Sequence, residues 1–322
     1  MPPRRVIGID AGGTKLLGGV VDEDLVVHHR VHRLWRGADR QETLAIFLEA
    51  VEEVRAAAPE VEAVGFGLPA LVEWETGISR WSNHLPLDDV AFRDFMTERL
   101  SLPVVVDNDG NASVLAEARA GAARDARHVV MISLGTGIGS GLWLDGAVYR
   151  GASGMGSELG HTVLDIHGPD CPGDCPGRGC FEVLVSGNAI GREGERVAAE
   201  EPDTELGRRL ATGLEISGGI VTELAHSGDQ AALEVVAEIG RRLGYGLVGV
   251  VNIFNPEVIV IGGGAVRAGE LLLEPARRVV AERALPPARE AVRIVAAHFG
   301  DESGMLGAAM MALDLLGEEP RS

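Results

Sequence analysis

The sequence predicts an α/β fold built from two lobes, and three observations lead to this prediction. The chain is 322 residues long, which exceeds the ~100–200 residues of a typical single domain. Apolar runs typical of strands alternate with patterns typical of helices, as in an α/β lobe. A glycine-rich hairpin pattern near the N-terminus returns midway along the chain, which indicates a duplicated architecture.

Composition restricts the function. Hydrophobic residues make up 46% of the chain and charged residues 24%, while the 44 glycines are about twice the usual ~7% share. The net charge of −19 opposes binding to nucleic acid and to anionic membranes. No apolar run reaches the ~18 residues of a membrane span, and the run at 6–9 is too short for a signal peptide. We therefore expect a cytoplasmic protein with no nucleic-acid or membrane partner.

The first hairpin pattern consists of the apolar runs 6–9 and 16–21 around a glycine turn. That turn is made of Asp10, Ala11, Gly12, Gly13, Thr14 and Lys15. Its glycines let the backbone approach phosphate oxygens, its threonine adds a hydroxyl donor, and Asp10 could hold the water shell of Mg²⁺. A strand follows instead of a helix, so the turn is no P-loop. An ordinary tight hairpin is the alternative, although Lys15 is the only lysine in the chain.

The second hairpin pattern runs from 129–134 to 142–144 and offers another phosphate site. The turn between the two runs contains Gly135, Thr136, Gly137, Ile138, Gly139, Ser140 and Gly141. A nucleotide held between two lobes needs one hairpin from each. The two glycine hairpins together are therefore a more specific sign of nucleotide binding than either hairpin alone. Gly262, Gly263 and Gly264 follow an apolar run and could let adenine lie against bare backbone. Tight packing of that strand against a helix is equally compatible with these glycines.

Apolar spacing predicts the remaining elements. The expected helices lie near 44–54, 92–100, 230–254, 270–283 and 305–316, and the expected strands near 61–66, 104–106, 258–261 and 292–296. The strand at 104–106 leads into the polar residues Asp107, Asn108 and Asp109. Phosphoryl transfer to a hydroxyl needs a carboxylate that accepts its proton. Asp109 is the candidate base and Asp107 its rival, and either could instead cap a helix that begins near Asn111.

A cluster of cysteines predicts a metal site. Cys171, Cys175 and Cys180 lie close together and, with His161, can form a closed tetrahedral zinc site that stabilises the fold. His167 is an alternative fourth ligand, and free buried cysteines are the alternative to any metal. The metal would hold Glu158, His161 and Glu182 in place, so these three are candidates to accept hydrogen bonds from sugar hydroxyls.

In combination these motifs resemble the ROK family of bacterial repressors, open reading frames and sugar kinases. The resemblance covers nearly the whole chain, with six elements in the expected order. It implies an actin-like ATPase (ribonuclease H-like) fold with a structural zinc site in the larger lobe. The smaller lobe would comprise residues 1–108 and the C-terminal helix 301–322, and the larger lobe residues 109–300. Dimers and tetramers are common in the family, so we expect a homodimer or homotetramer.

The resemblance also implies a role for each motif. Residues 10–15 and 135–137 look like the family's two phosphate motifs and 262–264 like its adenosine motif. Asn108 would bind sugar and Asp109 would act as catalytic base and contact the sugar. The expected sugar ligands also include Asn83, Glu158, His161 and Glu182. Two departures stand out: Cys171 and Cys175 are four positions apart instead of two, and Pro69-Ala70 replaces Pro-Gly, which adds a methyl group near the sugar.

The predicted function is therefore ATP-dependent phosphorylation of a hexose, a transferase step of carbohydrate metabolism and glycolysis, with Mg²⁺ and structural Zn²⁺. Glucose is the preferred acceptor, and N-acetylglucosamine, N-acetylmannosamine, mannose and fructose remain open. A sugar-sensing repressor is a remote alternative, since only nine residues precede Asp10 and a DNA-binding domain needs more. A non-sugar actin-like ATPase would leave Glu158, His161 and Glu182 unexplained.

Overall fold

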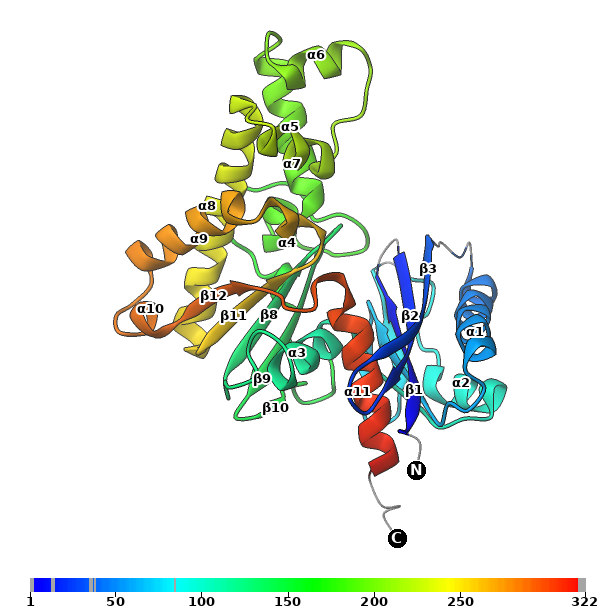
Figure 1. Cartoon of the computed structure of the whole chain (residues 1–322). Coiled ribbons are helices and arrows are strands. Elements are labelled where there is room, and N and C mark those ends of the chain that lie inside the picture. The colour runs from blue at the N-terminus through cyan, green and yellow to red at the C-terminus, as the bar shows by residue number, and fades with distance from the viewer. Residues whose placement is uncertain (1–2, 13–14, 35–36, 38, 84, 318–322) are drawn as a thin grey trace. The chain divides into compact units, whose positions relative to one another are not determined.

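The chain folds into two compact α/β units, which confirms the predicted fold class (Figure 1). The computed structural model describes residues 3–12, 15–34, 37, 39–83 and 85–317, and the statements below concern these residues. Unit 1 comprises Met1–Asp125, Ser140–Ser157 and His298–Ser322, and unit 2 comprises Ala126–Gly139 and Glu158–Ala297. None of the helices in these ranges combines the length and the apolar character that crossing a bilayer requires.

The sheet of unit 1 has the strand order β3-β2-β1-β4-β7. These strands are β3 (Val27–Leu34), β2 (Lys15–Asp22), β1 (Arg5–Ala11), β4 (Val64–Leu68) and β7 (Val104–Asn108). β1, β2 and β3 pair antiparallel, whereas β1, β4 and β7 pair parallel. A small separate sheet pairs β5 (Leu71–Glu73) with β6 (Ile78–Trp81).

Helices cover both faces of the unit 1 sheet. On one face α1 (Arg40–Ala57) and α2 (Phe92–Leu100) contribute Phe47 and Phe92, which pack edge to face with Phe66 at centroid distances of 5.1 to 5.9 Å. On the other face lie α3 (Asp109–Arg119) and α11 (Ser303–Gly317). A Cβ atom at Gly65 would lie 1.9 Å from the Ala308 carbonyl oxygen, so glycine is required for α11 to approach the sheet this closely.

The second sheet repeats the topology of the first, with the order β10-β9-β8-β11-β12. Its strands are β10 (Ala147–Val148), β9 (Ile138–Leu144), β8 (Val129–Leu134), β11 (Val258–Gly262) and β12 (Arg293–Ala296). β8, β11 and β12 pair parallel, as β1, β4 and β7 do. The two hairpins predicted from the glycine turns therefore occupy equivalent places in two sheets, which is the predicted duplication.

Unit 2 also holds most of the helices that follow the second hairpin. They are α4 (Phe181–Val185), α5 (Gly187–Glu200), α6 (Glu205–Ala211), α7 (Gly218–His226), α8 (Gln230–Phe254), α9 (Glu270–Arg283) and α10 (Ala288–Ala291). Short 3-10 turns cover Leu159–His161, Gly264–Ala268 and, in unit 1, Gly300–Glu302. In Figure 1 α5, α6 and α7 form a green group beside the N-terminal half of α8.

The compact units differ from the predicted lobe boundary near Asn108. Residues 109–125 belong to unit 1 because α3 packs against α11, and residues 140–157 join them. The division into lobes 1–108 with 301–322, and 109–300, stays a prediction.

Candidate functional site

The carboxyl ends of three parallel strands in unit 1 bring two predicted site segments to one sheet edge. Asp10 of β1 pairs with Gly67 of β4, and Gly67 pairs with Asp107 of β7. A Cβ atom at Gly67 would lie 3.3 Å from the Cα of Asp109 and 3.5 Å from Oδ1 of Asp10. The strand between the two carboxylates therefore carries no side chain there. Ligands of open α/β sheets bind at such carboxyl ends.

The carboxylate of Asp107 is buried and accepts three hydrogen bonds from neighbouring groups. Its side chain is 0% exposed, and Oδ2 accepts from Nε of Arg150 at 2.8 Å. Oδ1 accepts from the Asn108 amide at 2.8 Å and from Nδ2 of Asn111 at 2.9 Å. Burial raises the pKa of Asp107, although Arg150 and the hydrogen bonds oppose this rise. This buried and hydrogen-bonded carboxylate is less accessible to an incoming hydroxyl than that of the half-buried Asp109.

Asn108 and Asp109 begin α3. Oδ1 of Asn108 caps this helix by accepting from the Gly110 amide at 2.8 Å and from the Asn111 amide at 3.4 Å. Neither aspartate is the cap, because the helix begins at Asp109 and not near Asn111 as expected. Nδ2 of Asn108 donates to the Ala70 carbonyl oxygen at 3.3 Å, and this bond uses one of its two hydrogens. Asp109 is half-buried, and its Oδ1 lies 2.9 Å from the Gly110 amide.

The first glycine turn closes as a hairpin. The Gly12 amide donates to the Lys15 carbonyl oxygen at 2.8 Å, and the Lys15 side chain is exposed at the start of β2. Gly13 and Thr14, both predicted nucleotide ligands, lie outside the described residues. A Cβ atom at Gly304 would lie 2.5 Å from Oδ2 of Asp10, so the first turn of α11 lies directly against this carboxylate. Burial raises the pKa of Asp10 to about 7, and the charge of Asp301 contributes to the rise.

Asn83 and Ala70 lie near the same edge. Ser82, which precedes the half-buried Asn83, donates its hydroxyl to the Pro69 carbonyl oxygen at 2.6 Å. Ala70 is 4% exposed and belongs to the apolar core of unit 1. The extra methyl group is therefore packed in the core, and its effect on the choice of hexose stays a prediction.

In unit 2 the second glycine turn is fixed by a buried carboxylate. Oε2 of Glu182 accepts from the Ile138 amide at 2.8 Å, and a Cβ atom at Gly137 would lie 2.1 Å from that oxygen. The Gly187 amide donates to the Gly135 carbonyl oxygen at 2.8 Å. Thr136, at the tip of the turn, is exposed. The α4 region thus supports the predicted phosphate hairpin.

The three glycines after β11 differ in their surroundings. Gly263 has φ of 78°, and a Cβ atom there would lie 2.6 Å from the Leu134 carbonyl oxygen. A Cβ atom at Gly262 would lie 2.5 Å from the Met131 side chain, whereas one at Gly264 would meet nothing within 4 Å. Tight packing explains the first two, against β8 instead of a helix, and only Gly264 leaves open space.

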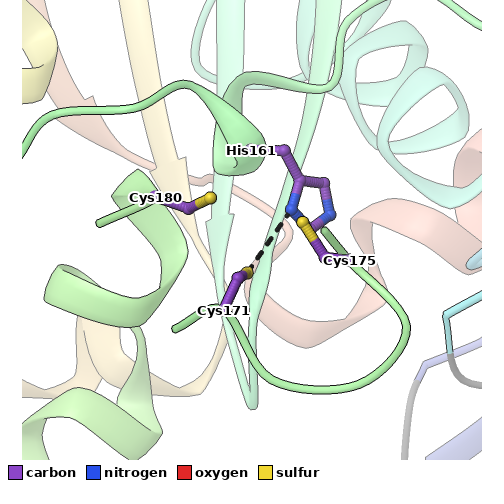
Figure 2. Close-up of side chains that lie close together, drawn as sticks. All are labelled: His161, Cys171, Cys175 and Cys180. Atoms are coloured by element: carbon purple, nitrogen blue, oxygen red, sulfur yellow. Dashed lines mark hydrogen bonds between the residues drawn. The ribbon is translucent and has the colours of Figure 1, made fainter. Parts of the chain in front are cut away.

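His161 and the three cysteines converge on one point of unit 2. Figure 2 shows Cys180 at the start of α4, His161 at the end of its 3-10 turn and Cys171 and Cys175 on the loop between them. One ligand atom of each lies within 4.8 Å of all the others, and Sγ of Cys171 lies 3.7 Å from Nδ1 of His161. A tetrahedral zinc ion with bonds of about 2.0–2.3 Å separates its ligand atoms by about 3.5–3.8 Å, which requires only slight closure.

The loop that carries the cysteines shows which histidine joins them and whether the longer spacing of Cys171 and Cys175 permits the cluster. His167 is exposed and outside the cluster, so His161 is the histidine that accompanies the cysteines. Gly173, with φ of 74°, lies in the longer loop, which still brings Cys175 to the cluster. Burial raises the pKa of Cys171 and of Cys180, so the metal must displace thiol protons on binding.

Glu158 lies near the same cluster. The residue is exposed overall, yet protein atoms crowd its carboxylate, and this burial raises the pKa of Glu158. The charge of Glu182 raises it further, whereas His161 lowers it. Glu158, Glu182 and His161 are thus close enough for their charges to interact.

Comparisons with known proteins identify the family. The ROK family's sequence profile matches residues 6–315. The chain belongs to the ROK family. A glucokinase of Thermotoga maritima is 34% identical over 98% of this chain and 100% of its own length. A putative xylose repressor of Caldicellulosiruptor sp. (strain Rt8B.4) is 31% identical over 97% of this chain and 79% of its own length.

Solved structures agree with this ROK assignment. The crystal structure of a ROK family glucokinase from Streptomyces griseus, in complex with glucose and AMPPNP, has a TM-score of 0.88 and 30% identity. The match covers 96% of this chain and 99% of that one. The predicted family and fold are thereby confirmed.

Two residues that no sequence motif predicts lie beside the candidate base segment. Arg150 pairs with Asp107, and the centre of its guanidinium lies 3.7 Å from the ring centroid of Trp74. Neither is part of a motif, and the chain separation between Asp107 and Arg150 hides their contact from sequence patterns.

Proposed function

We propose that this ROK protein is an ATP-dependent hexose kinase and that glucose is its acceptor. The observation that carries the proposal is the unequal surroundings of the two candidate bases: Asp107 is 0% exposed and fully hydrogen-bonded, whereas Asp109 is half-buried at the end of β7. Glucokinases are among the most similar relatives.

The reaction needs one proton acceptor and one anchored phosphoryl donor. Asp109 accepts the proton of the sugar 6-hydroxyl while that oxygen attacks the γ-phosphorus of ATP. The bond from this phosphorus to the bridging oxygen breaks, and ADP leaves. Asp10 would hold the water shell of Mg²⁺, which supplies charge stabilisation for the phosphates when bound. Gly12, Gly13, Thr14, Lys15 and the residues 135–137 would hold the phosphates, and residues 262–264 would lie against the adenosine.

Polar side chains are the proposed ligands of the acceptor. Asn83, Asn108 and Asp109 are the proposed ligands from unit 1, and Glu158, His161 and Glu182 those from unit 2. His161, Cys171, Cys175 and Cys180 offer the donor set of a closed structural zinc site. Zinc bound there would hold the loop before Glu182 in one conformation. This is the structural role that we propose for the metal.

A coupled assay of ADP release tests this function. Purified protein with Mg-ATP should phosphorylate glucose with a higher kcat/KM than N-acetylglucosamine, N-acetylmannosamine, mannose or fructose. If another hexose is preferred, the proposed substrate is wrong but the proposed reaction, phosphorylation of a hexose by ATP, still holds. ADP release that no sugar stimulates would end the kinase proposal.

The repressor relatives give a second candidate, since the putative xylose repressor matches 97% of this chain in sequence. A sensor needs sugar affinity but no proton acceptor, so the carboxylate of Asp109 favours the enzyme. Turnover of ATP that depends on sugar separates the two. Specific duplex binding at physiological salt would favour the repressor.

The proposal includes a cytoplasmic location, a role in glycolysis and a homodimer or homotetramer. The charge of −19 favours neither nucleic acid nor membrane as a partner. Light scattering coupled to size exclusion measures the oligomeric state directly.

A further inference from the structure

Arg150 makes two unusually specific contacts within unit 1. Its Nε donates to the buried Asp107 at 2.8 Å, and its guanidinium stacks on Trp74 at 3.7 Å from the ring centroid. Its side chain is only 21% exposed. A planar guanidinium can pair and stack at the same time, which a lysine ammonium cannot. Sequence position alone gives no reason for such a buried pair.

The partner of Arg150 stands next to the proposed base. Asp107 precedes Asn108 and Asp109, and it also binds the Asn108 amide and the Asn111 side chain. Arg150 is therefore connected to the end of β7 and to the first turn of α3 through the carboxylate of Asp107. Asp107 in turn holds Asn108 by its backbone.

Arg150 also begins the segment that leads into Glu158. The Gly156 amide donates to the Arg150 carbonyl oxygen at 2.9 Å, which closes residues 150–156 into a loop. Gly154, with φ of 89°, packs so closely on β5 that a Cβ atom would lie 2.5 Å from the Val72 carbonyl oxygen. The Ser140 hydroxyl donates to the Ser157 carbonyl oxygen, and Ser157 has φ of 74°. The chain just before Glu158 is thus fixed at both ends.

We infer that Arg150 is a positioning residue that sets the distance between the base segment, Asn108–Asp109, and the segment 150–157 that leads to the sugar ligand Glu158. The inference rests on the proposed function. It assigns Arg150 no contact with substrate: the residue acts through Asp107 on one side and through its own loop on the other. Misplacement of reacting groups by about 1 Å can cost about 10² in rate.

Kinetics of Arg150→Met test the inference. We expect kcat/KM for the sugar to fall about 10²-fold, while the KM for ATP changes less than about twofold, because the side-chain contacts of Arg150 with Asp107 and Trp74 lie outside residues 10–15 and 135–137. The matched control is Arg80→Met, which removes ion pairs with Glu73 at 2.7 Å and with Asp89 at 3.2 Å, two residues that lie outside β7 and the segment 150–157. The control should leave both constants within about twofold, as loss of a surface ion pair does.

A double variant separates positioning from simple stability. Arg150→Met leaves the buried Asp107 charge unpaired and should lower Tm, whereas Asp107→Asn/Arg150→Met removes both charges and should recover most of that Tm. The low kcat/KM for the sugar should persist in the double variant, because the link between the two segments is still absent. Should Arg150→Met fail to fold, Arg150→Lys carries the same test with the charge retained.

The outcomes are distinct. Unchanged sugar kinetics in Arg150→Met, or activity that returns together with Tm in the double variant, would overturn the inference alone. A wild-type protein that phosphorylates no sugar would overturn the proposed function and the inference with it. A persistent loss in kcat/KM for the sugar at restored Tm supports both.

Discussion

At the scale of single residues, two carboxylates that are two positions apart in sequence differ in chemistry because of their neighbours. Asp107 is surrounded by donors and excluded from solvent, whereas Asp109 begins α3 at the open end of β7. The sequence named Asp109 as the candidate base and Asp107 as its rival, and the family resemblance favoured Asp109. The structure adds a physical difference between them through Arg150, which pairs with Asp107 from a distant part of the chain and which no sequence pattern predicts.

The role of Asp109 can be tested by removing its carboxylate. Asp109→Ala should lower kcat by about 10²–10⁴, the contribution of a general base, while sugar affinity stays close to wild type. Kinetics and isothermal titration with the sugar measure the two quantities. Asp125→Ala, at a side chain that is 90% exposed, is the control and should keep full activity. Wild-type turnover in Asp109→Ala would remove Asp109 from the mechanism.

Asp10, a proposed nucleotide ligand, makes the stability of the fold depend on pH. With a folded-state pKa of about 7 against an ordinary value of 3.8, the folded protein binds more protons than the unfolded chain between these values. Stability contributed by this group is therefore present at low pH and lost as pH rises through about 7. Above pH 7 the ionised Asp10 lowers the free energy of unfolding by at most about 4 kcal/mol, since one pKa unit corresponds to about 1.4 kcal/mol.

Asp10→Asn should consequently unfold at higher urea concentration than wild type at pH 8 in EDTA, with the difference shrinking toward pH 5. The same variant should lose kinase activity, because the amide is a poor partner for the water shell of Mg²⁺. Urea unfolding at both pH values measures the first effect. Equal pH dependence of wild type and variant would show that burial does not perturb Asp10.

At the scale of elements, sequence patterns located α2, α8 and α9 at their observed bounds but missed the group α5 to α7. The expected helices at 230–254 and 270–283 match α8 and α9. The region of α5 to α7 was not predicted, because its glycines weaken helix propensity and its helices depend on packing. A Cβ atom at Gly194 of α5, for example, would lie 2.5 Å from the Val221 side chain of α7.

The strand expected at 61–66 shows the same limitation. β4 instead covers Val64–Leu68 and includes Gly65 and Gly67, which disfavour a strand by propensity. Pairing with β1 on one side and β7 on the other determines the strand, and Gly65 leaves room for α11. Contacts distant in sequence therefore override the local pattern.

The second glycine turn and α4 form a unit that can be tested at Gly137. A methyl group there would lie 2.1 Å from Oε2 of Glu182 and displace the carboxylate from the Ile138 amide. Gly137→Ala should raise the KM for ATP by about tenfold or more, which corresponds to about 1.4 kcal/mol. Gly249→Ala, at a helical position with open space, should leave the kinetics unchanged. A normal KM for ATP would show that the turn tolerates the displacement.

The metal cluster makes a prediction for the loop that precedes α4. Cys175→Ser should lose stoichiometric zinc and weaken sugar binding, because thiolate is replaced by a poor zinc ligand and the loop before Glu182 is released. Elemental analysis and sugar titration measure the two effects. His167→Ala should retain zinc, since His167 lies outside the cluster. Wild-type protein purified without zinc would contradict this assignment.

At the scale of the whole molecule, the duplicated sheets explain why the motifs come in pairs. The sequence predicted this repetition from the two hairpins, and the strand orders confirm it. The boundary between the units was harder to predict, because the chain passes from one unit to the other at four places: 125/126, 139/140, 157/158 and 297/298. Only tertiary contacts define such a division.

Glu117 holds the chain beside two of these passages. Its buried carboxylate accepts from the Ala122 amide at 2.9 Å, from the His298 and Phe299 amides at 3.0 Å each, and from the Ser303 hydroxyl at 2.7 Å. The end of α3 and the start of α11 are thereby joined through one side chain. All four donors lie within unit 1, next to the points where the chain leaves it.

Glu117→Ala should therefore be among the most destabilising substitutions in the protein, at about 3–5 kcal/mol, because it leaves several buried donors without an acceptor. Glu117→Gln keeps one acceptor oxygen, so its free energy of unfolding should fall less than that of Glu117→Ala. Urea unfolding measures both, and hydrogen exchange at residues 121–123 and 298–303 should accelerate in the alanine variant more than at β8 and β11. If both variants unfold like wild type, these passages are held by the packing of α3 against α11 and not by the carboxylate.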